Sequence, residues 1–164
     1  MQIIRFSDQQ LPQSFQNEIT EFLFEHLQEF GDPAEDIQLA LDYAGQKNGG
    51  KGGHVLVAKE NNEILGAVVV NKTGMKRYIP ENILVYIATH SGYRGKGIGG
   101  KLMQEAIHAC EGDIALHCEP DNPARQLYEK LGFTSKYLEM RLTKNNNVDS
   151  NTEHEKAQGE FHIS

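Results

Sequence analysis

The stretch SGYRGKGIGGKL, residues 91–102, satisfies three different phosphate-binding patterns at once. Its glycines fit G-x-G-x-x-G, the Gly100-Lys101 pair completes G-x-x-x-x-G-K, and Arg94 opens [QR]-x-x-G-x-[GA]. The three patterns share one physical basis. Glycines let main-chain N–H groups approach a phosphate, and the helix that follows presents unpaired donors and a partial positive charge. The patterns nevertheless imply three different folds: a P-loop hydrolase, a dinucleotide-binding domain or a coenzyme A site.

The chain around the stretch argues against the first two patterns. A P-loop needs Ser or Thr after its lysine to hold Mg²⁺, but Leu102 occupies that position. A dinucleotide fold gains support from Glu119, near the expected spacing of about 20 residues beyond the glycines. However, residues 90–94 separate the glycines from the preceding strand, and too little chain follows to complete a doubly wound sheet. The coenzyme A pattern is therefore favoured.

The flanks of the stretch predict a strand, a loop and a helix in that order. Residues 83–89, ILVYIAT, form a nearly continuous apolar strand of the kind found in the middle of a sheet covered on both faces. Residues 101–110, KLMQEAIHAC, place their apolar side chains on one helix face, and Gly112 ends that helix. The other hydrophobic patterns predict strands at 2–6, 54–60, 64–70, 114–118 and 136–142, and helices at 12–30, 33–43 and 121–131.

Composition limits the class of protein. The 164 residues fit one domain, which we place at 1–143, with a polar tail at 144–164 that is predicted to be flexible. A net charge of -7 argues against nucleic acid or an anionic membrane as partner and favours a cationic substrate. Two cysteines are too few for a disulfide framework, and neither a signal peptide nor a membrane-spanning run is apparent, so a cytoplasmic location is expected.

Two segments together resemble one known family. Residues 83–107 resemble the acyl-CoA-binding segment of the GNAT superfamily of N-acetyltransferases, with its apolar strand, Arg- and Gly-rich loop and helix. Residues 122–133, NPARQLYEKLGF, resemble the second hallmark of that superfamily, in which an Asn opens a helix that carries a Tyr and ends at Gly-Phe. Because the two motifs occur in the expected order and at the expected spacing, the coenzyme A site is favoured over the other two alternatives.

The resemblance implies a fold and an activity. The fold would be a single α/β (α+β) domain with a mixed central sheet of six to seven strands flanked by about four helices. The activity would be acetyl transfer from acetyl-CoA to a primary amine, on a small molecule or a protein, without a metal. The alternative is a non-catalytic acyl-CoA-binding or regulatory module. A homodimer stays open as an alternative to a monomer.

The resemblance also assigns the residues that bind acetyl-CoA. The main chain of the strand before the loop would pair with the pantetheine arm, as a peptide adds to a sheet edge. The loop amides and the helix N-terminus would surround the pyrophosphate. Asn122 would contact the donor or simply cap the helix that follows it. The complete set is Ile87, Ala88, Thr89, Arg94, Gly95, Lys96, Gly97, Ile98, Gly99, Gly100 and Asn122.

A general acid follows from the same resemblance, but a general base does not. Tyr128 occupies the position of a tyrosine that often protonates the departing thiolate in the superfamily. A phenol with a pKa of about 10 can serve as an acid toward a thiolate with a pKa of about 8 to 9. Several members place a base glutamate on the central strand, where this chain has Ile83. The candidates for the base are therefore Glu81, Tyr86 and His117, or ordered water.

The expected mechanism is direct transfer. The amine attacks the thioester carbonyl, main-chain donors near Thr89 stabilise the oxyanion, and Tyr128 protonates the leaving group. A competing route would use Cys118 as an acyl-carrying nucleophile. Its neighbour His117 would point to the opposite face of the sheet, so the two adjacent residues do not make a dyad.

Overall fold

The computed structural model describes residues 1–145, and its chain divides into two units, Met1–Phe133 and Thr134–Ser164. All helices and strands of the described residues lie in the first unit. In chain order they are β1 (Gln2–Ser7), α1 (Gln13–Leu27), η1 (Gln28–Phe30), α2 (Ala34–Ala44), η2 (Lys47–Gly49), β2 (Gly53–Glu60), β3 (Glu63–Lys72), β4 (Asn82–Thr89), η3 (Ser91–Tyr93), α3 (Ile98–Ala109), β5 (Ile114–Leu116) and α4 (Arg125–Lys130). No helix within the described residues is long and apolar enough to cross a lipid bilayer.

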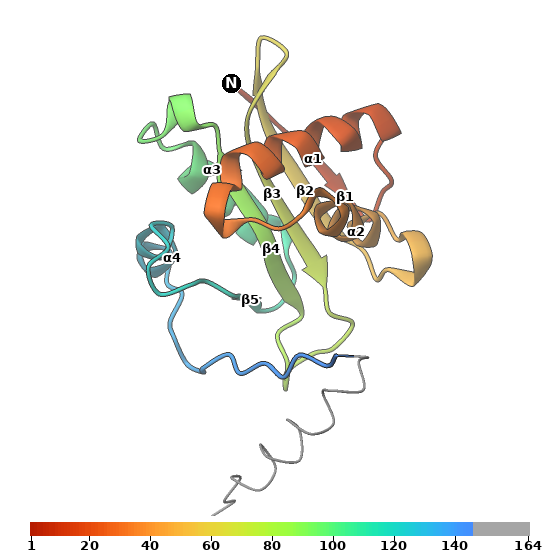
Figure 1. The fold of residues 1–164 in the computed structure, drawn as a ribbon, viewed down its shortest axis with the longest axis vertical. Helices are drawn as coiled ribbons and strands as arrows, with labels where there is room; N and C mark the ends of the chain where they lie inside the picture. Colours follow the sequence, from red (N-terminus) through yellow and green to blue (C-terminus); the bar gives the residue numbers. More distant parts are fainter. Residues whose placement is uncertain (146–164) are drawn as a thin grey trace, which may run out of the picture. The chain divides into compact units, whose positions relative to one another are not determined.

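The strands form one mixed sheet in the order β1-β2-β3-β4-β5 (Figure 1). The first four strands are antiparallel neighbours, and β5 pairs with β4 in parallel. Asn61 and Asn62 form the tight turn between β2 and β3, both with positive φ, as a two-residue hairpin turn requires. The predicted hairpin and the mixed sheet are therefore confirmed.

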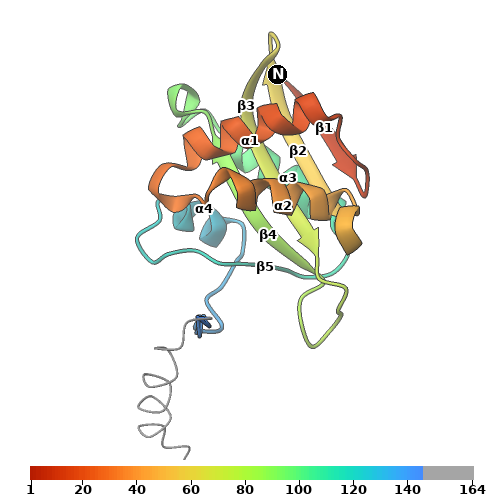
Figure 2. The ribbon, with the colours of Figure 1, turned by 45° about the vertical axis from the view of Figure 1, so that its right-hand side comes forward.

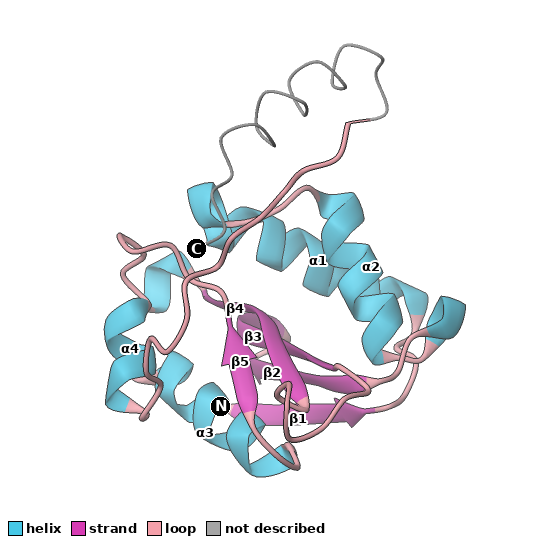
Figure 3. Ribbon diagram, turned by 90° about the horizontal axis from the view of Figure 1, so that it is seen from below, coloured by secondary structure: helices cyan, strands magenta, loops and turns pink. Residues whose placement is uncertain are grey.

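Helices cover both faces of this sheet, α1 and α2 on one face and α3 and α4 on the other (Figure 2, Figure 3). Successive side chains of a strand point to opposite faces, so alternate residues enter two separate cores. On the α1–α2 face the strands contribute Val55, Val57, Ala67, Val69, Tyr86 and Ala88. On the α3–α4 face they contribute Leu56, Ala58, Val68, Val70 and Leu84.

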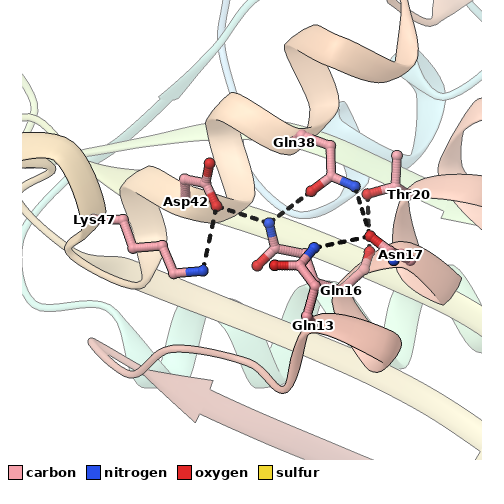
Figure 4. A network of polar contacts seen from close by, with 7 residues as sticks. All are labelled: Gln13, Gln16, Asn17, Thr20, Gln38, Asp42 and Lys47. Atoms are coloured by element: carbon pink, nitrogen blue, oxygen red, sulfur yellow. Dashed lines mark hydrogen bonds and ion pairs between the residues drawn. The ribbon is translucent and has the colours of Figure 1, made fainter.

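Buried polar side chains, in addition to the core, hold α1 against α2 (Figure 4). Gln16 is only 2% exposed, and its Nε2 donates to Gln38 Oε1 at 2.7 Å and to Asp42 Oδ1 at 2.8 Å. Asn17 Oδ1 accepts from Gln38 Nε2 at 3.1 Å and from Gln13 Nε2 at 2.9 Å. The network fixes α1 relative to α2, and it therefore also restrains residues 28–33, which connect the two helices.

Replacing Gln16 tests this network. We expect Gln16→Leu to lower the free energy of unfolding by about 1–3 kcal/mol, because Asp42 and Gln38 lose a buried donor while the volume is nearly kept. Gln13→Leu is the matched control, since Gln13 is exposed and bonds only to Asn17. Urea denaturation of both variants measures the difference, and equal stability of the two would contradict the role of Gln16.

The sequence overestimates the sheet. It predicts six to seven strands, but the described residues form five, and the predicted strand at 136–142 is absent. Its alternating pattern is genuine, yet Tyr137, Leu138 and Met140 are more than 80% exposed. Alternation does not suffice, because a strand also needs a partner for its main-chain N–H and C=O groups. Most of the predicted tail at 144–164 lies outside the described residues.

Candidate active site

The glycine-rich stretch forms a loop between β4 and α3. Gly95 and Gly97 adopt φ of +81° and +80°, in the left-handed region that residues other than glycine rarely enter. A Cβ atom built on either residue would meet nothing within 4 Å. These two glycines are thus required by the turn itself, and they face open space that a ligand can fill.

The first turn of α3 adds main-chain donors to this space. Lys101 N, which donates to Gly97 O at 3.1 Å, makes the first hydrogen bond of the helix. The amides of Ile98, Gly99 and Gly100 therefore have no partner within the helix, and the helix dipole gives this end a partial positive charge. Such an arrangement suits an anion, and in particular a phosphate.

Gly99 and Gly100 lie in the first turn of α3, next to α4. A Cβ atom on Gly99 would lie 3.3 Å from Thr89 Oγ1 and 3.6 Å from Leu127 Cδ2, and one on Gly100 would lie 4.0 Å from Leu127 Cδ1. The distances to Leu127 are ordinary van der Waals contacts, so Leu127 does not require glycine at either position. The motifs at 83–107 and 122–133 therefore meet in the structure.

The edge of β4 beside the loop is open. β4 pairs with β3 from Asn82 to Thr89 with one interruption, but β5 pairs only with Asn82 to Leu84. A shift in register between Val69 and Val70 of β3 leaves Val85 without a partner residue. His90 N donates to Leu65 O at 2.8 Å, so by alternation the main-chain groups of Ile87 and Thr89 point away from β3. An extended ligand can pair with them there.

This open edge and loop lie within a segment that matches a known family. Residues 51–135, about half of the chain, match the family described as "Acetyltransferase (GNAT) domain". The chain belongs to this family. The family resemblance predicted from residues 83–107 and 122–133 is confirmed.

Relatives and solved structures agree with this membership. The chain is 38% identical over 82 residues to N-alpha-acetyltransferase 30 of Xenopus laevis, and this match covers 47% of the chain and 30% of the relative. It is 36% identical over 75 residues to mycothiol acetyltransferase of Corynebacterium glutamicum (strain R), covering 42% of the chain and 26% of the relative. The matches thus span less than a third of the length of these curated relatives.

A solved structure supports the fold. The ribosomal-protein-alanine N-acetyltransferase from Brucella melitensis biovar Abortus 2308 superimposes with a TM-score of 0.62. The superposition covers 89% of this chain and 100% of that chain at 17% sequence identity. At an identity this low the superposition shows a shared fold and no more. This fold agrees with the predicted single α/β domain, in which helices flank a mixed sheet.

The two basic residues of the GNAT loop have partners within the chain. Arg94 Nη2 donates to the main-chain oxygen of His26 in α1 at 3.0 Å. Lys96 Nζ lies 5.2 Å from the centre of the Tyr93 ring, within the range of a cation–π interaction. This hydrogen bond of Arg94 connects the loop to α1, and it keeps the positive charge of the guanidinium group next to the loop.

Asn122 closes a turn directly before α4. Its Oδ1 accepts a hydrogen bond from Ala124 N at 2.9 Å, and its main-chain oxygen accepts from Arg125 N at 3.0 Å. The N-cap of α4 is Ala124, so Asn122 stabilises the turn and does not cap the helix itself.

Tyr128 lies on α4 within the core of the α3–α4 face. Its side chain is 8% exposed, and it shares a cluster with Ile98 of α3 and Ile87 of β4. Burial raises the pKa of Tyr128 to about 12, with a smaller contribution from Cys118. The phenol therefore keeps its proton throughout the neutral range, as a general acid must.

Of the three candidates for the base, Glu81 lies at the end of β4 that is far from the loop. It precedes β4, where its Oε1 accepts from Asp113 N at 3.3 Å. Eight residues of extended chain separate it from Thr89, roughly 25 Å along the strand. His117 is exposed and follows Leu116, whose partner on β4 is Leu84, so it comes directly after the point where pairing with β5 ends.

Tyr86, the third candidate, leads to a residue that the sequence analysis missed. Its side chain is 7% exposed, and its hydroxyl donates to Asp32 Oδ2 at 2.6 Å. Burial, followed by this hydrogen bond, raises the pKa of Tyr86, so the phenol stays protonated. Asp32 itself is exposed, in the connection between η1 and α2. No local pattern of the sequence indicates this role for Asp32, because its contact with Tyr86 spans 54 residues.

Cys118 does not have the properties of an acyl carrier. Burial raises the pKa of its thiol, and Sγ donates to Glu119 O at 3.3 Å. A nucleophilic cysteine needs a lowered pKa, because the thiolate is the reactive form. Within the described residues, no group of three His, Cys, Asp or Glu side chains is arranged to hold a metal ion.

Proposed function

We propose that this chain is an N-acetyltransferase, which moves the acetyl group of acetyl-CoA to a primary amine by direct attack. Family membership supports the reaction class. The observation that carries the proposal is the open edge of β4, which leads through a positive-φ glycine loop into the unpaired N-terminus of α3. An elongated donor with a phosphate-bearing end fits this sequence of features.

The donor would bind along two parts of the chain. Amides from Gly95 to Gly100 would donate to the pyrophosphate, whose charge the α3 dipole favours. The main-chain groups of Ile87 and Thr89 would pair with the amides of the pantetheine arm. Ala88 faces β3 with its main chain and the core with its side chain, so it would support this edge through packing.

The residues that act on the donor and those that bind the acceptor would lie on opposite faces of the sheet. Tyr128 lies on the α3–α4 face, whereas Tyr86 and Asp32 lie on the α1–α2 face. Pairing with β5 ends at Leu84, so the thioester would lie beside Val85, where both faces are within reach. The amine would then approach from the α1–α2 face, with its ammonium bound to the Asp32 carboxylate.

Acetyl transfer would form a bond at the amine nitrogen and break the bond between the acetyl carbon and the sulfur. The ammonium loses one proton to solvent beside Asp32, and the amine nitrogen forms a bond to the thioester carbon. A main-chain N–H group of β4 beside Val85 would donate to the oxygen that becomes negative. The C–S bond breaks as Tyr128 gives its proton to the sulfur, and the new amide releases its extra proton to solvent, from which Tyr128 is reprotonated.

An acceptor screen tests the proposed function. The purified protein would be incubated with acetyl-CoA and a panel of peptides with free α-amines, aminoglycosides and small polyamines, and the products would be measured by mass spectrometry. We expect a primary amine that gains one acetyl group, with an equal amount of free coenzyme A. Tight binding of coenzyme A without product on any amine would favour a non-catalytic acyl-CoA-binding module.

Asp32→Asn tests the acceptor side. We expect kcat/KM for the amine to fall by about 10- to 100-fold, because a charge-assisted hydrogen bond to the ammonium is lost. The affinity for coenzyme A should stay the same, since Asp32 lies on the other face of the sheet. Glu35→Gln is the matched control, as this exposed carboxylate begins α2 and has no bond to Tyr86. Equal losses in both variants would remove the specific role of Asp32.

A further inference from the structure

Two histidines stack between α1 and the segment that leads into the glycine loop. The rings of His26 and His90 lie 4.3 Å apart between centroids, with 35° between their planes. His26 comes from α1 and is 5% exposed, whereas His90 directly follows β4. Phe22 packs against His26 on one side and Tyr93 against His90 on the other.

Both rings accept a hydrogen bond from the turn η3. Ser91 N donates to His26 Nδ1 at 3.1 Å, and Gly92 N donates to His90 Nδ1 at 3.0 Å. A nitrogen that accepts has a lone pair and no proton, so each neutral ring has its proton on Nε2. The ring of His26 on α1 therefore holds η3 through a contact that spans 65 residues of sequence. Arg94 forms a second hydrogen bond to His26, at its main-chain oxygen.

A second proton on His26 would break this arrangement. It could attach only to Nδ1, where it would face the N–H group of Ser91 and remove the acceptor. Burial lowers the pKa of His26, and repulsion from His90, when that ring is charged, and from Arg94 lowers it further. Glu25, 3.7 Å from His26 Nε2, and Glu63, 3.3 Å from His90 Nε2, act in the opposite direction, but the net shift is downward.

We propose that His26 is a positioning residue for the donor-binding loop, and that it holds η3 and the loop in place only while its ring is neutral. This inference rests on the proposed function of the loop. Acid then weakens donor binding. The bond to Ser91 is present at neutral pH and is lost as the pH falls below about 6.5, the ordinary pKa of histidine, through the lower pKa of the folded state.

Two substitutions at position 26 separate the acceptor from the titration. In His26→Asn, Oδ1 takes the place of Nδ1 as acceptor but cannot be protonated in this range. In His26→Leu, a side chain of similar size has no acceptor. Calorimetric titration with coenzyme A, from about pH 7.5 to about pH 5.5, measures the dissociation constant for all three proteins. Circular dichroism at each pH shows that each protein remains folded.

We expect the wild-type dissociation constant to rise more over this range than that of His26→Asn, by up to about tenfold, which is the limit for a single group with the ordinary histidine pKa of about 6.5. Protonation of the coenzyme A phosphate affects both proteins equally and therefore cancels in this comparison. His26→Leu should bind weakly at every pH. A wild type that binds at neutral pH but shares the pH profile of His26→Asn would overturn the inference and leave the proposed function intact. A wild type that binds no coenzyme A at any pH would instead overturn the proposed function.

Discussion

Gly97→Asp is expected to abolish coenzyme A binding without unfolding the protein. A side chain at this position enters the open space that faces the loop, and its carboxylate would lie where the pyrophosphate binds. Steric overlap and charge repulsion would then act together against the bound pyrophosphate. We expect the affinity to fall by at least about 100-fold, measured by calorimetric titration.

The matched control for this substitution is Gly49→Asp. Gly49 has the same φ of +80° and equally open surroundings, but it lies in η2, between α2 and β2. Both variants should therefore have the same backbone strain, about 1–2 kcal/mol, in thermal or urea unfolding. Only Gly97→Asp should lose coenzyme A binding. Unchanged binding by Gly97→Asp would contradict the assignment of the loop, and equal losses in both variants would attribute the effect to strain.

Tyr128→Phe is expected to lower kcat by about 100-fold while the affinity for acetyl-CoA stays nearly the same. The substitution removes only the hydroxyl group, and the ring keeps its packing against Phe133, with centroids 5.9 Å apart. Because the pKa of Tyr128 is about 12, its proton is present over the whole neutral range. The wild-type rate should therefore not decline from loss of this acid until strongly alkaline pH.

Tyr43→Phe serves as the control for removing a tyrosine hydroxyl. Tyr43 on α2 donates to Lys72 O at 2.6 Å, away from the loop. This variant should lose stability, by about 1 kcal/mol, but no catalytic rate. Steady-state kinetics with acetyl-CoA and the amine found in the acceptor screen measures both variants. A Tyr128→Phe enzyme with the wild-type kcat would exclude Tyr128 as the acid.

Local patterns predicted the strand, loop and helix of the proposed donor site because these elements form one continuous segment. Apolar residues of β4, the glycines and the helical spacing of α3 are adjacent in sequence, so their order specifies the strand, loop and helix. The sequence did not distinguish the glycines, however. Gly95 and Gly97 are required by positive φ, whereas Gly99 and Gly100 are helical residues at which a Cβ atom would be in ordinary contact with Leu127.

The parts that could not be predicted depend on contacts between distant residues. Asp32 reaches Tyr86 across 54 residues, and His26 reaches Ser91 across 65, so no local spacing indicates either pair. The strand expected at 136–142 fails for a related reason. Its period of two describes how side chains would alternate, but strand formation depends on a partner that the pattern does not specify.

The most direct test of the donor site is a crystal structure of the protein with coenzyme A at neutral pH. The proposed function predicts pyrophosphate oxygens within hydrogen-bond distance of the amides between Gly95 and Gly100. It also predicts a pantetheine arm that pairs with the main chain of Ile87 and Thr89, with its sulfur between Val85 and Tyr128. Coenzyme A bound elsewhere, with this loop and the edge of β4 left free, would contradict it.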